Sequence, residues 1–137
     1  MSTPAPVSKA KLEALALEAR GRAYAPYSGY SVGAALEADD VTVYTGCNVE
    51  NASYSVTCCA ERSALFAAVS AGVRTFRRIV VTAGGSSPYP CGSCRQALAE
   101  FAPRLEVVVL TDDGERHEFT LDRLLPHPFR FERERQS

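Results

Sequence analysis

Hydrophobic positions along the chain switch between helix-like and strand-like spacing. The first pattern begins at Ser8 and predicts an N-terminal helix capped by that serine, because its apolar residues recur every three or four positions. These apolar positions are Leu12, Leu15, Ala16 and Ala19. Proline and glycine in AYAPYSGYSVG (23–33) then favour a loop. GAALEA (33–38) and TVYTGC (42–47) predict two strands of a hairpin that turns at Asp39–Asp40.

The second half alternates helical and β-branched segments. CAERSALFAAVSAG (59–72) predicts a helix with a small-residue face, and its last glycine is a natural C-terminal stop. RRIVVTAG (77–84) and LEVVVLTD (105–112) are short apolar runs suited to buried strands. CGSCRQALAEFA (91–102) predicts a further helix, and TLDRLLP (120–126) a short terminal one that Thr120 could cap.

The order of these elements sets the expected fold class. Strands alternating with helices predict βαβ units, a partly parallel sheet and helices on both faces. We therefore expect an α/β protein, a three-layer α/β/α sandwich with a mixed sheet. The chain of 137 residues shows no internal repeat or linker, so 1–137 is predicted to be a single domain. Residues 1–7 are expected to form a disordered lead and 130–137 a solvated tail.

Composition and charge limit the kinds of partner and the compartment that we expect for the protein. A formal net charge of −1 with scattered Lys and Arg disfavours nucleic acid. No apolar run approaches the roughly 20 residues that a membrane-spanning helix needs, so no membrane is expected. The N-terminus MSTPAPVSKA lacks the apolar core of a signal peptide, which predicts a cytoplasmic protein. There, five cysteines, an odd number, favour metal binding or chemistry over disulfides.

The cysteines lie in two clusters, each at the start of a predicted helix. Cys91 and Cys94 have the spacing C-x-x-C, which lets one helical turn present both thiolates to a single zinc ion. Helix N-termini also lower thiol pKa values. A third ligand would come from TCCAER at 57–62, where spacing alone does not choose between Cys58 and Cys59. Three protein ligands leave a fourth position for water, as in catalytic sites.

Glu61 lies next to the candidate third ligand. Zinc lowers the pKa of a bound water, and a neighbouring carboxylate can take and redeliver its proton. Arg62 would offset the net charge of −1 that three thiolates leave on Zn²⁺. His117 and His127 belong to no ligand-spaced motif and are expected to be surface or loop residues.

The segments CAE and PCGSC resemble the zinc-dependent deaminase signature. Four blocks resemble the small cytidine deaminases in the same order, from residue 23 to about residue 125. They are AYAPYSGYSVGAAL, GCNVENASY, CAERSALFAAVSAG and PCGSCRQALAEF. The resemblance implies a cytidine deaminase-like fold, Cys59 rather than Cys58 as the third ligand, one Zn²⁺ per subunit and a homotetramer. It also implies the charge-offsetting role of Arg62.

The same resemblance implies a reaction and a substrate site. Zinc-bound hydroxide would attack C4 of cytidine or deoxycytidine in pyrimidine salvage, with Glu61 as proton shuttle, giving uridine or deoxyuridine. The substrate-binding residues would be Asn48 and Glu50 on the ribose hydroxyls, Tyr30 against the pyrimidine, the Ala60 backbone at the base edge, and Phe129 in a neighbouring subunit's pocket. The family usually carries phenylalanine where this chain has Tyr30. The carboxylate of Glu50 would favour nucleosides over nucleotides.

Other functions remain open at this point. A deaminase of aminopyrimidine antibiotics such as blasticidin shares the size and signature. A deaminase of nucleic acid would need a basic groove. A structural zinc module with Cys58 as fourth ligand would leave Glu61 without a purpose, and a thiol redox protein would use CGSC alone.

Overall fold

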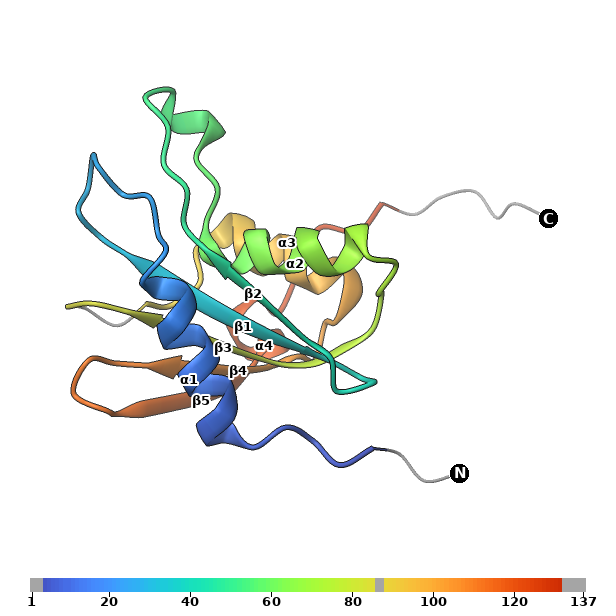
Figure 1. Cartoon of the computed structure of the whole chain (residues 1–137). Coiled ribbons are helices and arrows are strands. Elements are labelled where there is room, and N and C mark those ends of the chain that lie inside the picture. Colours follow the sequence, from blue (N-terminus) through green and yellow to red (C-terminus); the bar gives the residue numbers. More distant parts are fainter. Residues whose placement is uncertain (1–3, 86–87, 132–137) are drawn as a thin grey trace.

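Five strands form one mixed sheet in the order β2-β1-β3-β4-β5. The structure, a computed structural model, describes residues 4–85 and 88–131 (Figure 1). The strands are β1 (Val32–Ala38), β2 (Val43–Cys47), β3 (Phe76–Ala83), β4 (Glu106–Leu110) and β5 (Arg116–Thr120).

The strand pairings follow from the connections. β1 pairs with both β2 and β3 in antiparallel fashion, and β4 pairs antiparallel with β5. β3 and β4 are parallel, because the helix between them returns the chain to the same end of the sheet. A loop after the carboxyl end of β3 connects it to Cys91, where α3 begins.

Helices cover both faces of the sheet. They are α1 (Lys9–Arg20), α2 (Ala60–Ser70), α3 (Gly92–Phe101) and α4 (Leu121–Leu124), with a short 3₁₀ turn at Tyr54–Val56. α1 lies on one face, and α2 and α3 lie on the other (Figure 1). The predicted three-layer α/β/α sandwich with a mixed sheet is confirmed.

Two apolar clusters hold the layers together. Leu12 and Ala16 of α1 pack against Ala35, Val80 and Val108 on one face. The larger cluster fills the other face, between the sheet and the helices α2, α3 and α4. Strand β1 is buried along its whole length, as expected for a strand with layers on both sides.

Helix α1 begins where the sequence predicts it. The Ser8 hydroxyl accepts a hydrogen bond from the Lys11 N–H at 3.2 Å, so the predicted cap of α1 is confirmed. The Val7 N–H donates to the buried carboxylate of Glu37 at 2.7 Å. Parts of the predicted lead and tail, 1–3 and 132–137, lie outside the described residues. No helix within the described ranges is long and apolar enough to cross a membrane.

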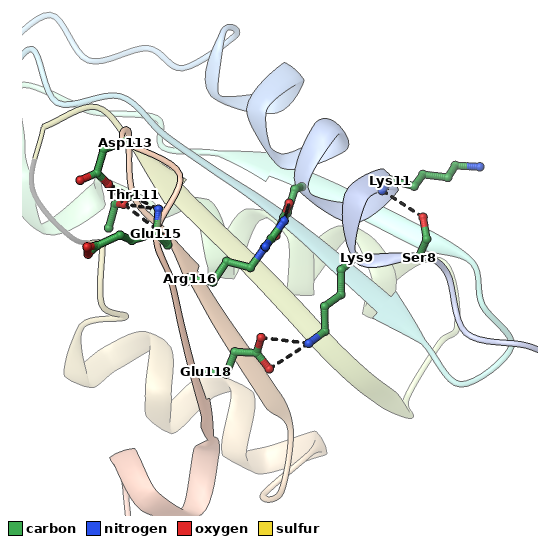
Figure 2. A network of polar contacts seen from close by, with 9 residues as sticks. Ser8, Lys9, Lys11, Thr111, Asp113, Glu115, Arg116 and Glu118 are labelled. Atoms are coloured by element: carbon green, nitrogen blue, oxygen red, sulfur yellow. Dashed lines mark hydrogen bonds and ion pairs between the residues drawn. The ribbon is translucent and has the colours of Figure 1, made fainter.

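Strand β5 is an element that sequence patterning missed. Its residues alternate between exposed and half-buried, because it forms an edge of the sheet. Ion pairs attach it to α1. Lys9 contacts Glu118 at 2.9 Å (Figure 2). Arg116 binds the carboxylate of Glu13. The strand therefore depends on contacts with a helix about a hundred residues away in the chain.

A glycine on β2 lets α2 lie directly on the sheet. A Cβ at Gly46 would come within 2.5 Å of the Ala60 carbonyl oxygen and the Ala64 nitrogen. The absence of a side chain at Gly46 thus sets how closely the first turn of α2 approaches β2.

Candidate metal centre and substrate cavity

Three cysteines meet where α2 and α3 begin. Cys59 is the N-cap residue of α2, Cys91 is the N-cap residue of α3, and Cys94 lies in the first turn of α3. Their sulfur atoms all lie within 4.8 Å of one another. Both helices follow loops that leave the same region of the sheet, so two distant segments deliver one sulfur cluster.

The spacing of the sulfur atoms suits zinc. Two thiolates bound to one Zn²⁺ at about 2.3 Å each, with tetrahedral angles, lie about 3.8 Å apart. The Sγ atoms of Cys59 and Cys91 are 3.8 Å apart. Among the described residues this is the cluster of cysteine, histidine and acidic side chains that fits a metal ion. Three soft ligands leave one tetrahedral position for a further ligand.

The structure distinguishes the two adjacent cysteines. Cys58 exchanges backbone hydrogen bonds with Val49 at 2.9 and 3.0 Å, and its sulfur accepts from the Ser63 hydroxyl at 3.6 Å. It lies outside the three-sulfur cluster. Cys59 has an extended backbone at φ −73°, ψ 157°, so it precedes the helix rather than lying on it. For this reason helical spacing between Cys59 and Glu61 cannot be used to place the cysteine.

Arg62 compensates negative charge at the cluster. Its Nη2 donates to the Cys59 sulfur at 3.4 Å. Hydrogen bonds from Cys94 and Arg62 lower the pKa of the Cys59 thiol to about 5. The pKa of Cys94 is raised, chiefly because its proton is held in the hydrogen bond to Cys59. The guanidinium therefore favours the thiolate form that a metal ligand needs.

Glu61 lies beside the cluster in the first turn of α2. The residue is only 4% exposed, and burial raises the pKa of its carboxyl to about 7. The negative charge of Cys59 acts in the same direction. A carboxyl with this pKa exchanges protons readily near neutral pH, as a general acid–base requires.

A cavity of about 190 Å³ opens next to the cluster and Glu61. Its wall comes from the loop before β1, the end of β2, the start of α2 and the β3–α3 loop. The lining residues are Tyr30, Val32, Asn48, Thr57, Cys59, Ala60, Glu61, Pro88, Tyr89 and Cys91. Seven of the residues chosen from sequence thus meet here, counting Cys94 behind the lining.

Asn48 is buried at the end of β2 and fixes the neighbouring loop. Its Nδ2 donates to the Tyr30 carbonyl at 2.7 Å, and its Oδ1 accepts from the Val32 N–H at 2.9 Å. The side chain therefore holds Tyr30 against the cavity. Sequence reasoning did not anticipate these two bonds.

Glu50 lies next to this cavity rather than in it. It lines an adjoining hollow with Tyr27, Ser28 and Tyr54, and Thr57 borders both hollows. Its carboxylate accepts from the Tyr27 and Ser28 N–H groups at 2.9 and 3.1 Å and from the Ser28 hydroxyl. These bonds, the serine side chain first, lower the pKa of Glu50 and keep it ionised.

Phe129 does not reach the cavity of its own chain. The residue is 72% exposed, and its backbone is held by Gln96 through two hydrogen bonds of 2.9 Å. The clamp fixes the backbone on α3 and leaves the aromatic ring facing outward.

Four lining residues were not chosen from the sequence: Val32, Thr57, Pro88 and Tyr89. Tyr89 and Pro88 stand just before Cys91, so closeness to a candidate ligand was the signal that could have found them. Thr57 stands two residues before Cys59 and Val32 two residues after Tyr30, so the same signal applies to them.

Fold and site together define an α/β protein with a three-cysteine metal centre at paired helix starts and a buried carboxyl beside it. Residues 7–111 match the family described as the cytidine and deoxycytidylate deaminase zinc-binding region. The chain belongs to this family.

Known proteins are similar to this one in sequence and structure over most of the chain. A cytidine deaminase from Sporosarcina psychrophila is 51% identical over 121 residues, 87% of this chain and 89% of the relative. One from Halalkalibacterium halodurans is 48% identical over 116 residues, 83% of this chain and 88% of the relative. The crystal structure of cytidine deaminase from Burkholderia pseudomallei superposes with a TM-score of 0.87 at 45% identity, covering 90% of this chain and all of that one.

Proposed function

We propose that the protein catalyses the zinc-dependent hydrolytic deamination of cytidine and deoxycytidine to uridine and deoxyuridine. The observation that carries this proposal is the buried carboxyl of Glu61 beside three converging thiols at the wall of a small cavity. Cys59, Cys91 and Cys94 would hold one Zn²⁺. When bound there, zinc acidifies a water that can attack C4 of the cytosine ring.

Glu61 moves the protons of the reaction. Its carboxylate would take a proton from the attacking water and give it to N3 of the ring as the C4–O bond forms. It would then carry the proton of the new C4 hydroxyl to the amino group, which leaves as ammonia when the C4–N bond breaks. Burial serves this role because it raises the pKa of Glu61 to about 7, although the positive charge of a bound metal would lower that value. The guanidinium of Arg62 offsets part of the negative charge of the thiolates.

Ala60, Tyr30, Asn48 and Glu50 orient the nucleoside. The backbone of Ala60 meets the base edge, and Tyr30 packs against the ring from a loop that Asn48 holds in place. Asn48 and Glu50 bind the ribose hydroxyls, the second from the adjoining hollow. Because Glu50 is ionised, it repels a 5′-phosphate. The substrates are therefore nucleosides.

A homotetramer in the cytoplasm, serving pyrimidine salvage, is the setting that fits this activity. Exposed Phe129 would then enter a neighbouring subunit's cavity. The clamp by Gln96 supports this, because it presents the ring at a fixed position on the surface.

Initial rates measured by the ultraviolet absorbance change test the proposal. Zinc-loaded protein should deaminate cytidine and deoxycytidine, and cytidine monophosphate at least about tenfold less efficiently. Equal turnover of the monophosphate would contradict the role of Glu50. Absence of turnover of either nucleoside, with zinc confirmed by metal analysis, would reject the proposed activity and favour another aminopyrimidine such as blasticidin.

A further inference from the structure

Tyr89 lines the cavity but has no role in the mechanism above. It stands two residues before Cys91 in the β3–α3 loop and is partly exposed. Its ring rests against β5, with centroids 5.7 Å from Phe119 and 6.2 Å from His117. The edge strand that the sequence pattern missed thus supports one wall of the cavity.

The order of the strands in the sheet indicates which side of the cavity Tyr89 closes. β2 and β5 are the two outer strands, and β3 lies at the centre. Asn48 directly follows β2, whereas Tyr89 contacts Phe119 on β5. Tyr89 therefore closes the cavity on the β5 side, opposite the side where Asn48 and the proposed sugar site lie.

Described residues on either side of Tyr89 are held by hydrogen bonds. The Gly85 N–H donates to the Asp112 carboxylate at 3.0 Å. Arg95 donates from Nε to the Pro90 carbonyl at 2.7 Å and from Nη1 to the Leu124 carbonyl at 2.8 Å. A tyrosine ring that packs against two other rings, next to residues held by these bonds, can discriminate between substrates by shape.

We propose that Tyr89 is a specificity-determining residue that limits the substituent at C5 of the pyrimidine, and that Phe119 positions it. This inference rests on the proposed function. With C4 at the sulfur cluster, N3 toward Glu61 and the sugar toward Asn48, the C5–C6 edge is the part of the ring left to face the β3–α3 loop. The ring of Tyr89 then stands where a methyl group at C5 would extend.

The test compares kcat/KM for cytidine and 5-methylcytidine across variants. Tyr89→Ser should raise the 5-methylcytidine to cytidine ratio at least about tenfold, because a methyl-sized difference in a pocket is worth about 10–200-fold. Phe119→Ala should raise the ratio by a smaller factor, because the ring of Tyr89 remains but loses the aromatic ring against which it packs. Tyr89→Phe keeps an aromatic ring at this position and should therefore have the same ratio as wild type.

Glu118→Ala is the matched control. Glu118 is on the same strand as Phe119 but points to the other face, where it pairs with Lys9 of α1 (Figure 2). Its removal should leave the ratio unchanged. Tyr89→Leu, which retains an apolar anchor for the loop, replaces the serine variant should that variant unfold. A ratio within about twofold of wild type in the folded serine or leucine variant would overturn the proposal.

Binding separates this proposal from the proposed function. Calorimetric dissociation constants for uridine and 5-methyluridine need no turnover, and Tyr89→Ser should shift their ratio toward the methylated nucleoside. A wild-type protein that deaminates cytidine while its variants keep the same ratios refutes the role of Tyr89 alone. A wild-type protein without deaminase activity refutes the proposed function, and the binding ratio still decides the role of Tyr89.

Discussion

Substitution of Gly46 by alanine tests how strongly activity depends on the placement of α2. The added Cβ would lie 2.5 Å from the Ala60 carbonyl oxygen, 2.5 Å from the Ala64 nitrogen and 2.9 Å from the Ser63 Cβ. Two of these atoms belong to the helix backbone, so the helix itself must move. Ordinary contact begins at 3.4 Å, and the move from 2.5 to 3.4 Å displaces the first turn by about 0.9 Å.

That first turn carries Glu61 and follows Cys59. A misplacement of about 1 Å at reacting groups costs roughly 100-fold in rate, so Gly46→Ala should lower kcat for cytidine about 100-fold. Overpacking should also lower the free energy of unfolding by about 1–3 kcal/mol. The assay combines initial rates, thermal unfolding and zinc content at a temperature where the variant is folded.

Gly92→Ala is the matched control. A Cβ at Gly92, the first residue of α3, meets no atom within 4 Å. Alanine there favours the helix, so stability should hold or rise while kcat stays within about threefold of wild type. The reasoning is refuted if Gly46→Ala also keeps kcat within about threefold of wild type while folded and zinc-loaded.

Two further predictions follow from single contacts. Arg95→Gln removes the guanidinium that holds the loop before Cys91, so zinc should pass to a chromophoric chelator about 10–100-fold more readily; unchanged transfer would contradict this. Glu13→Gln removes the partner of Arg116, whose hydrogen bonds lower the pKa of Glu13 from its ordinary 4.5. The contribution of this ion pair to the free energy of unfolding is fully present above about pH 4.5. It is lost as the pH falls through the lowered pKa of Glu13. The variant should therefore unfold at a lower temperature than wild type at pH 7, and this difference should shrink as the pH falls below about 4.5. A pH-independent difference would argue against the ion pair.

Local signals made much of the fold predictable. The hairpin turn at Asp39–Asp40 joins two strands as expected, and α2 ends next to Gly72, which has φ of +93°. Each of these features depends on residues close together in the chain. The placement of Cys59 and Cys91 at helix starts depends on the same kind of signal.

The rest depends on contacts between distant segments. Strand β5 reads RHEFT, and its charged residues gave no apolar run, because an edge strand buries only one side and that side incompletely. Tyr89 lines the cavity, and its ring packs against Phe119 of that strand. The choice of Cys59 over Cys58 required the structure or the resemblance, since the backbone bends just where the helix begins.

Glu61→Ala removes the carboxyl on which the proposed reaction depends. This buried carboxyl would move protons in both halves of the deamination, so its removal should cost more than the 10²–10⁴-fold in rate that is usual for one general acid–base step. Zinc-loaded wild type and variant are compared by initial rates of cytidine conversion, with zinc content measured in both. The account predicts rapid turnover by the wild type and a loss of more than about 10⁴-fold in a variant that keeps its zinc. A zinc-loaded variant that retains activity within about tenfold of wild type would contradict it.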